Sequence, residues 1–252
     1  MSPSPCHLNV LLACTDSDNK FDQATIDRLS PEVANIIANS NIAVSKALFI
    51  YYAASEDQCE DYLRDNIQKL FGKRPVECII PGQDANMIDQ AECIVVGGGD
   101  LNKLVTKASP FGGNIWKKVL SGVPFVGINA GAMFLSSRYI TIPAGTVSNF
   151  NFFPLQYISA YTNSTQDQAN IKNILNNNQQ IRYALCMPNI SNQGGGGIIL
   201  EDATAGLAGL QSSGSGGGSL KELYIYERDG GGGISEVIWT SPQRKQLPIN
   251  YM

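Results

Sequence analysis

The clearest chemical pattern in the chain is the turn 127–131, whose sequence is GINAG. It follows the apolar run 123–128 and precedes a helix-like segment, 130–137. A strand that turns sharply into a helix at G-x-S-x-G presents its middle residue on an exposed corner, where many hydrolases carry a serine nucleophile. Here that residue is Asn129, and a carboxamide has no hydroxyl or thiol to activate. The pattern predicts a hydrolase corner without its nucleophile.

A second turn, Gly97-Gly98-Gly99-Asp100, follows the apolar run 93–96. Neither the P-loop nor the dinucleotide glycine spacing is present, so a tight strand-to-helix turn is favoured over phosphate binding, with Asp100 as a helix N-cap. The carboxyl ends of parallel strands meet at one edge, so both turns should face one crevice. Backbone N–H groups near Gly98, Gly99 and Ala130 are predicted to form an oxyanion-type nest.

Other reactive side chains are few. Cys14 ends the first apolar run and is an alternative nucleophile, although a cysteine without a nearby base is usually a small core residue. Ser136 and Ser137 lie about two helical turns beyond Asn129, so the corner does not present them. The single histidine, His7, precedes the first predicted strand.

Composition excludes several classes. The net charge is −4, the pI is about 5.0 and no Lys/Arg cluster is visible, so we expect no nucleic-acid partner. The six cysteines form no C-x-x-C or paired spacing, which predicts neither a metal site nor a disulfide framework and favours a cytoplasmic setting. The apolar runs are too short to span a membrane, no secretory signal is recognised, and no cofactor motif is present.

The first half of the chain alternates short β-rich runs with helical patterns. Strands are expected at 8–13, 46–54, 76–80, 93–96 and 123–128. Helices are expected at 21–38 with a restart at Ser30-Pro31, and at 56–71, 86–90, 100–106 and 113–120. This order predicts an α/β fold: a mostly parallel sheet in a three-layer sandwich with helices on both faces.

The second half differs. It contains an aromatic stretch at 150–161, a polar Asn-rich helix at 167–178, a strand at 182–187, and strand-like runs at 198–200, 223–227 and 236–240 between Gly-rich loops. These runs predict antiparallel hairpins at the C-terminal edge of the sheet. We expect a single domain over 1–252, with a flexible N-terminus at 1–7 and a Gly-rich hairpin region at 194–252. The low charge and the Asn-rich helix predict self-association.

Three motifs together resemble those of peptidase E, the α-aspartyl dipeptidase, and of its relative cyanophycinase. They are 93–100 (CIVVGGGD), similar to a strand and GGGN; 127–132 (GINAGA), similar to G-x-S-A-G-A; and 152–156 (FFPLQ) with 161–163 (YTN), similar to F-P-L-Q, a histidine and F-T-N. The resemblance covers about 8–188. It implies a flavodoxin-like, class I glutamine-amidotransferase-like fold and hydrolysis after an aspartyl residue by a serine, a histidine and an acidic residue.

Each chemical position departs from that family pattern. Asn129 stands at the serine position, Ala160 at the histidine position and Asn189 near the acidic position. One hypothesis is therefore an inactive relative that acts as a binding, structural or assembly protein, with Gly98, Gly99, Asp100, Asn129 and Ala130 around a pocket for a small carboxylate or peptide. The alternative is a hydrolase of aspartyl peptides with a rearranged site that uses another nucleophile, such as Cys14.

Overall fold

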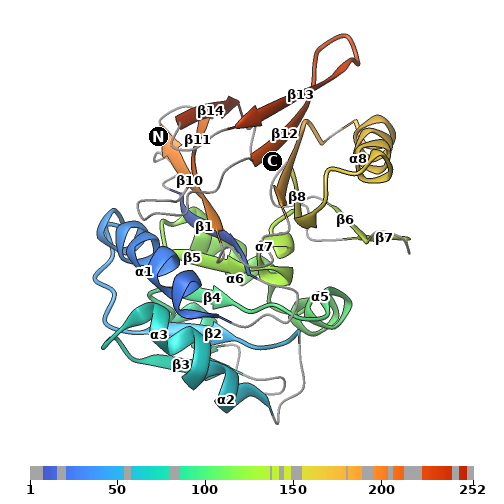
Figure 1. Ribbon diagram of the computed structural model, residues 1–252. Coiled ribbons are helices and arrows are strands. Elements are labelled where there is room, and N and C mark those ends of the chain that lie inside the picture. Colours follow the sequence, from blue (N-terminus) through green and yellow to red (C-terminus); the bar gives the residue numbers. More distant parts are fainter. Residues whose placement is uncertain are drawn as a thin grey trace.

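The computed structural model describes residues 8–15, 21–53, 58–79, 86–136, 138–141, 145–148, 155–179, 181–188, 196–203, 207–212, 223–239 and 244–248. The chain forms one large sheet with helices on both faces and a second, smaller sheet packed beside it (Figure 1). This arrangement confirms the α/β architecture expected from the alternation of strands and helices.

Five parallel strands form the centre of the main sheet. In spatial order they are β1 (Asn9–Cys14), β5 (Phe125–Ile128), β4 (Ile94–Val96), β2 (Ala47–Ile50) and β3 (Val76–Ile79). All five were expected from short apolar runs. Side chains of β1, β2, β4 and β5 are buried along their whole length, as is typical of parallel strands covered on both faces.

Three antiparallel strands extend the main sheet beyond β1. They are β10 (Gly196–Ala203), β11 (Leu207–Ser212) and β14 (Arg244–Pro248), each antiparallel to its neighbour. The expected C-terminal antiparallel edge is therefore present.

A second sheet holds the remaining C-terminal strands in the order β13 (Ile234–Trp239), β12 (Leu223–Arg228), β9 (Tyr183–Pro188) and β8 (Leu155–Tyr161). The hairpin β12–β13 pairs with β9, so its expected place at the edge of the main sheet was wrong. Periodicity indicates a strand but not its partner, because pairing depends on contacts distant in sequence.

A separate short hairpin joins β6 (Arg138–Thr141) to β7 (Gly145–Ser148). It follows the short helix that begins at Ala130 and belongs to neither of the larger sheets.

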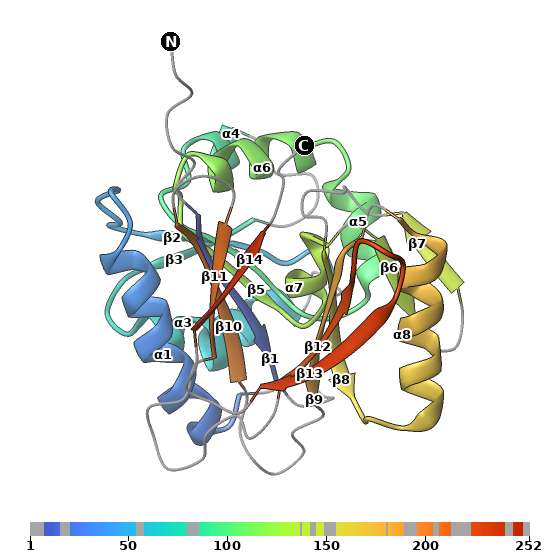
Figure 2. The same cartoon turned by 90° about the horizontal axis from the view of Figure 1, so that it is seen from above.

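Helices cover both faces of the main sheet (Figure 2). On one face lie α1 (Gln23–Ala38), α2 (Cys59–Tyr62), a π-helix η2 (Leu63–Ile67) and α3 (Gln68–Phe71). On the other lie α4 (Asn86–Asp89), α5 (Leu101–Ala108), α6 (Gly112–Leu120) and α7 (Ala130–Phe134), together with the second sheet.

Helix α1 runs without a break through Pro31, so the expected restart at Ser30-Pro31 was wrong. A proline inside a helix costs about 3 kcal/mol through a lost hydrogen bond and a clash. Leu29, Val33 and Ile36 are each at most 1% exposed on the sheet-facing side. Burying three such side chains contributes roughly 1.5–3 kcal/mol each, which outweighs the cost of the proline.

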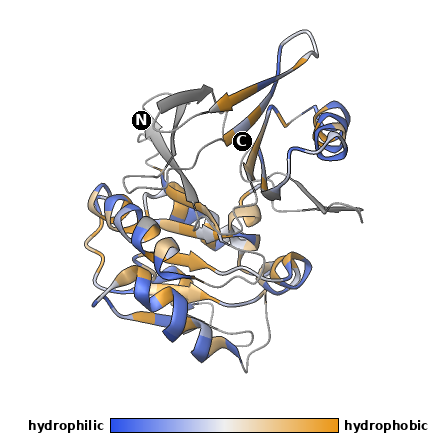
Figure 3. Cartoon of the chain, viewed as in Figure 1, coloured by the Kyte–Doolittle hydropathy of each residue, from blue (hydrophilic) through white to orange (hydrophobic). Residues whose placement is uncertain are grey.

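The strands of the second sheet other than the exposed edge strand β13 are covered on both faces. One face, with Tyr157 and Leu185, joins the core of the main sheet. The other face packs against helix α8 (Thr165–Asn177), whose Ile171 and Leu175 are fully buried. The hydropathy colouring shows the strands as largely apolar and α8 as largely polar, so α8 forms an outer layer (Figure 3). The expected Asn-rich helix is confirmed.

The cysteines differ from expectation in one respect. Cys59 is disulfide-bonded, although the sequence predicted no disulfide. A single disulfide produces no repeated cysteine spacing in the sequence that would predict it. Cys93 and Cys186 are unpaired by disulfides and fully buried, and burial raises the pKa of the Cys93 thiol to about 12.

Arg228 holds the end of α8 in place. Its guanidinium donates to the carbonyl of Asn178 at 2.9 Å and to the carbonyls of Gln179 and Ile181. Arg228→Met should lower the free energy of unfolding by about 1–3 kcal/mol, because the cap carbonyl of α8 and two carbonyls just beyond the helix lose a charged donor. Urea denaturation measures this loss.

The matched control is Arg182→Met. Arg182 pairs with Glu227 at 3.2 Å with half of its side chain exposed, so its loss should cost less than about 1 kcal/mol. Equal losses for the two variants would contradict the role assigned to Arg228.

Buried tyrosines predict loss of stability at high pH. The hydroxyl of Tyr161 lies 2.7 Å from that of Tyr226, and burial raises the pKa of Tyr161 and of Tyr183 to about 12. In the unfolded chain these phenols ionise near 10.0. Their contribution is therefore complete below the unfolded pKa and is lost as the pH rises from 10 toward 12. The urea concentration at the unfolding midpoint should be lower at about pH 11 than at about pH 9. An equal midpoint at the two pH values would contradict this.

Candidate functional site

The carboxyl ends of four parallel strands lie in one row. Leu12 is paired with Gly127, Gly127 with Val96, and Val96 with Ile50. The residues two positions further along each strand are Cys14, Asn129, Gly98 and Tyr52. The chain therefore places both predicted turns at the same edge of the sheet, on neighbouring strands.

Asn129 has the backbone of a nucleophile elbow, with φ 48° and ψ −105°. Two glycines allow the close approach that this geometry requires. A Cβ on Gly127 would lie 2.6 Å from the carbonyl oxygen of Gly131, and a Cβ on Gly131 would lie 2.0 Å from that of Val96. Helix α7 therefore begins in direct contact with the ends of β4 and β5.

The carboxamide of Asn129 is bound on both polar atoms by Thr15. Its Oδ1 accepts from the Thr15 N–H at 3.0 Å, and its Nδ2 donates to Thr15 Oγ1 at 2.7 Å. The Asn129 N–H donates to the carbonyl of Ala13 at 2.9 Å. These bonds tie the elbow to the end of β1. Thr15 was not among the predicted site residues, although it follows β1 as Asn129 follows β5.

The glycines after β4 form a tight turn from strand to helix, as the sequence predicted. Gly99 has φ 130°, and a Cβ there would lie 2.6 Å from the Ala53 carbonyl oxygen. The Asp100 N–H donates to that same carbonyl at 2.8 Å. The Asp100 carboxylate accepts from the N–H groups of Asn102 and Lys103, so Asp100 caps α5 as predicted.

Three backbone N–H groups at the two turns are candidate donors to a ligand. Within the part of the chain that is described, those of Gly98, Gly99 and Ala130 donate to no backbone carbonyl. Gly98 and Ala130 are buried and Gly99 is exposed. An oxyanion-type nest at this place stays a prediction, and these groups are the donors that it would use.

Cys14 lies beside the elbow but in an apolar environment. It is 2% exposed, and its Sγ donates to the Thr15 carbonyl at 3.4 Å. Burial in the apolar cluster that includes Leu12 and Met133 disfavours the thiolate.

Two buried phenols lie in the same cluster. In the described residues, the hydroxyls of Tyr52 and Tyr157 have no hydrogen-bond partner. Burial raises the pKa of Tyr157 well above its usual value, and the neighbouring Cys14 and Cys186 add to the shift. Ser136 is fully buried and its Oγ accepts from the Tyr157 N–H at 2.9 Å, so it is not presented to solvent, as expected.

The side chains of the remaining predicted site residues lie outside the described part of the chain. Ala160 lies in β8, but its side chain is outside the described residues. Asn189, His7, Ser137 and the aromatic residues at 150–153 lie outside them entirely. Among the described residues no group of three or more His, Cys, Asp or Glu side chains is arranged to hold a metal. In the same set, no helix has the length and apolar character needed to cross a membrane.

A small surface hollow lies at the opposite end of the sheet. Its lining includes Leu48, Met87, Lys46, Glu77 and Glu92. Lys46 and Glu77 pair at 2.9 Å, so their charges are mutually neutralised. Hydrogen bonds from Ser45 lower the pKa of Glu92. Lys46, Leu48 and Glu77 lie at the amino ends of β2 and β3, away from the elbow.

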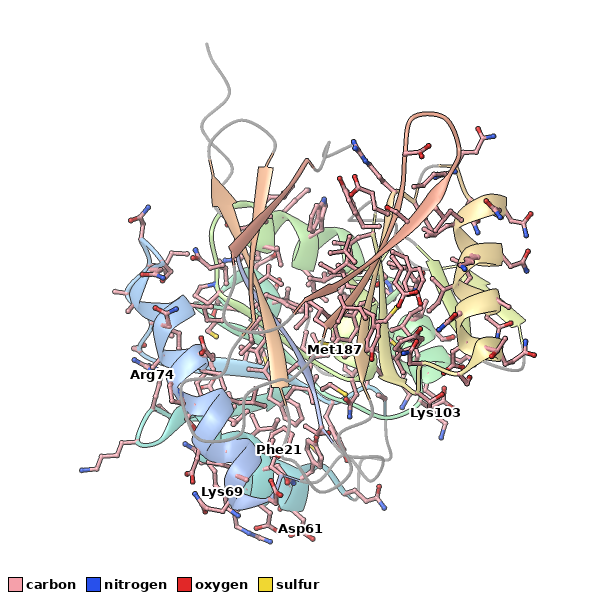
Figure 4. The ribbon with its side chains drawn as sticks, turned by 45° about the horizontal axis from the view of Figure 1, so that its top comes forward. Phe21, Asp61, Lys69, Arg74, Lys103 and Met187 are labelled. Atoms are coloured by element: carbon pink, nitrogen blue, oxygen red, sulfur yellow. The ribbon has the colours of Figure 1, made fainter. Side chains whose placement is uncertain are left out.

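The side-chain view separates interior from surface. Met187 of β9 is fully buried and lies centrally, whereas Asp61 and Lys69 extend from the surface near α2 and α3 (Figure 4).

Comparisons with known proteins agree with this fold. The model of peptidase family S51 matches residues 12–191. A peptidase from an acI-B1 actinobacterium has a similar fold, with a TM-score of 0.66 at 16% identity over 98% of this chain and 100% of that chain. A putative peptidase E protein from Listeria monocytogenes EGD-e has a TM-score of 0.51 at 17% identity, over 77% of this chain and 95% of that one. No curated protein matches.

The family match spans most of the chain. It includes the elbow at Asn129, the glycine turn after β4, and the positions Ala160 and Asn189. The two solved structures share the same flavodoxin-like arrangement. On this evidence the chain belongs to peptidase family S51.

Proposed function

We propose that this chain is a non-hydrolytic member of family S51 that binds a small carboxylate or peptide ligand at the elbow. The observation that carries the proposal is the two-way hydrogen bonding of the Asn129 carboxamide to Thr15. Serine-type hydrolysis needs a hydroxyl whose proton passes to a base. The lone pair of an amide nitrogen is delocalised into its carbonyl, so it cannot replace that hydroxyl.

The residues at the positions of the general base and its orienting acid support the same proposal. The family pattern implies a histidine at the position of Ala160, whose methyl group accepts no proton. The implied orienting acid corresponds to Asn189, which carries no charge. A nucleophile without a base that is itself oriented is inefficient. Three complementary losses in one chain favour the loss of turnover over a single change of nucleophile.

Binding is supported by what the elbow retains. The strained backbone of Asn129 and the glycines around it are intact, and such strain persists only where surrounding structure enforces it. The N–H groups of Gly98, Gly99 and Ala130 are donors for a carboxylate or carbonyl oxygen. Enzymes that lose their triad keep residual effects from the oxyanion hole and from binding.

Isothermal titration with an aspartyl dipeptide tests the proposal. We expect saturable binding, with the peptide recovered unchanged by mass spectrometry. Asn129→Leu should abolish binding, because it removes both hydrogen bonds to Thr15 that hold the elbow beside the N–H groups proposed to bind the ligand. Lys46→Gln, at the opposite end of the sheet, should leave binding unchanged. No binding of small carboxylates or dipeptides by the folded protein would contradict the proposal.

A hydrolase with a rearranged site is the second candidate, because the register places Cys14 next to Asn129. The burial of Cys14 and its hydrogen bond to the Thr15 carbonyl weigh against it. If the second candidate is correct, wild-type protein hydrolyses an aspartyl peptide and Cys14→Ala does not. We expect neither protein to turn over substrate, and we expect no labelling by serine-directed fluorophosphonates.

A further inference from the structure

The backbone of Asn129 brings two reactive groups to the same side of its Cα–C bond. Around that bond the Cβ lies about 120° from the main-chain nitrogen in any L-residue. At ψ −105° the nitrogen of Ala130 is therefore nearly eclipsed with the Cβ of Asn129. This is the torsion that a five-membered ring through the side-chain Cγ and the next backbone nitrogen requires. Ordinary helical torsions turn that nitrogen away.

The hydrogen bonds at Asn129 favour the same ring closure. The Thr15 N–H donates to Oδ1, where negative charge develops when Cγ is attacked. Thr15 Oγ1 lies 2.7 Å from Nδ2, the nitrogen that would leave. Within the described residues the Ala130 N–H donates to no backbone carbonyl, so no such bond withholds it. Asn129 is only half-buried, which gives water access to the product.

We propose that Asn129 is a site of spontaneous deamidation through a succinimide formed with Ala130. The Ala130 nitrogen loses its proton and bonds to Asn129 Cγ, the Cγ–Nδ2 bond breaks, and Nδ2 gains one proton and leaves as ammonia. Water then opens the ring at either carbonyl, which yields aspartate or isoaspartate. The reaction is redox-neutral and needs only water.

The product changes the elbow whichever carbonyl opens. Aspartate places a carboxylate where the carboxamide stood and removes the donor to Thr15 Oγ1. Isoaspartate also adds one methylene to the main chain between β5 and α7. This modification does not depend on the proposed ligand-binding function, because it arises from the backbone and the amide alone.

The test compares Asn129 with Asn39 in the same molecule. Asn39 is exposed, has ψ −12°, and precedes Ser40, a small polar residue that favours deamidation in unstructured chains. The full chain is incubated near neutral pH, natively and in urea, and both peptides are quantified by mass spectrometry. In the native protein Asn129 should convert on the order of tenfold faster than Asn39, because the fold aligns the reacting atoms. In urea the order should reverse.

Asn129→Gln is the chemical control, because its ring would be one atom larger and closes much more slowly. This variant should lose no ammonia at position 129 while Asn39 converts at the same rate as in wild type. In wild type, hydroxylamine should cleave the chain between Asn129 and Ala130 by trapping the succinimide. Native protein whose Asn129 stays intact while Asn39 converts would overturn the proposal, as would equal native and unfolded rates at Asn129.

Discussion

Replacing Gly131 with alanine is expected to lower the free energy of unfolding by about 3 kcal/mol or more, beyond the usual cost of overpacking. The new Cβ would lie 2.0 Å from the Val96 carbonyl oxygen and 3.0 Å from the Val96 Cβ. Val96 is fully buried between β2 and β5, so neither partner can move cheaply. Urea denaturation followed by circular dichroism measures the loss.

Gly113→Ala is the matched control for that experiment. Gly113 lies in α6, and a Cβ there would meet nothing within 4 Å. Alanine in a helix interior is favoured over glycine by roughly 0.5–1 kcal/mol, so this variant should be slightly more stable than wild type. Losses of similar size at Gly131 and Gly113 would show that α7 does not press on the sheet as described.

Changes at Asn129 should separate backbone strain from hydrogen bonding. Asn129→Val should cost about 3 kcal/mol, because a β-branched residue is strained at φ 48° and both bonds to Thr15 are lost. Asn129→Gly loses the same bonds but tolerates the positive φ, so it should cost only about 1 kcal/mol.

The order wild type, Gly, Val in falling stability is therefore expected in thermal or urea unfolding. A valine variant as stable as the glycine variant would contradict a left-handed elbow at this position. A glycine variant as stable as wild type would instead show that the bonds to Thr15 contribute nothing.

Local features of the fold could be predicted from the sequence. The five parallel strands follow from short apolar runs, and the Asp100 cap follows from residue type and position at a helix start. The glycines at Gly127 and Gly131 mark an elbow because only hydrogen fits where backbones touch. These features depend on neighbours close in sequence or on strict steric limits.

Features set by distant contacts could not be predicted. The partner of the β12–β13 hairpin is β9, which periodicity does not specify. Helix α1 continues through Pro31 because its buried face outweighs a local penalty. Thr15 contacts Asn129 across 114 positions of sequence, and its only signal was its place after a strand of a parallel sheet.

The most direct test of the central claim is turnover of an aspartyl dipeptide by the purified full chain, with released aspartate measured by chromatography against a protein-free blank. We expect no product above the blank for wild type and for Asn129→Ala alike. Product formed by wild type and lost in Asn129→Ala would contradict this expectation, because the elbow carboxamide would then take part in catalysis.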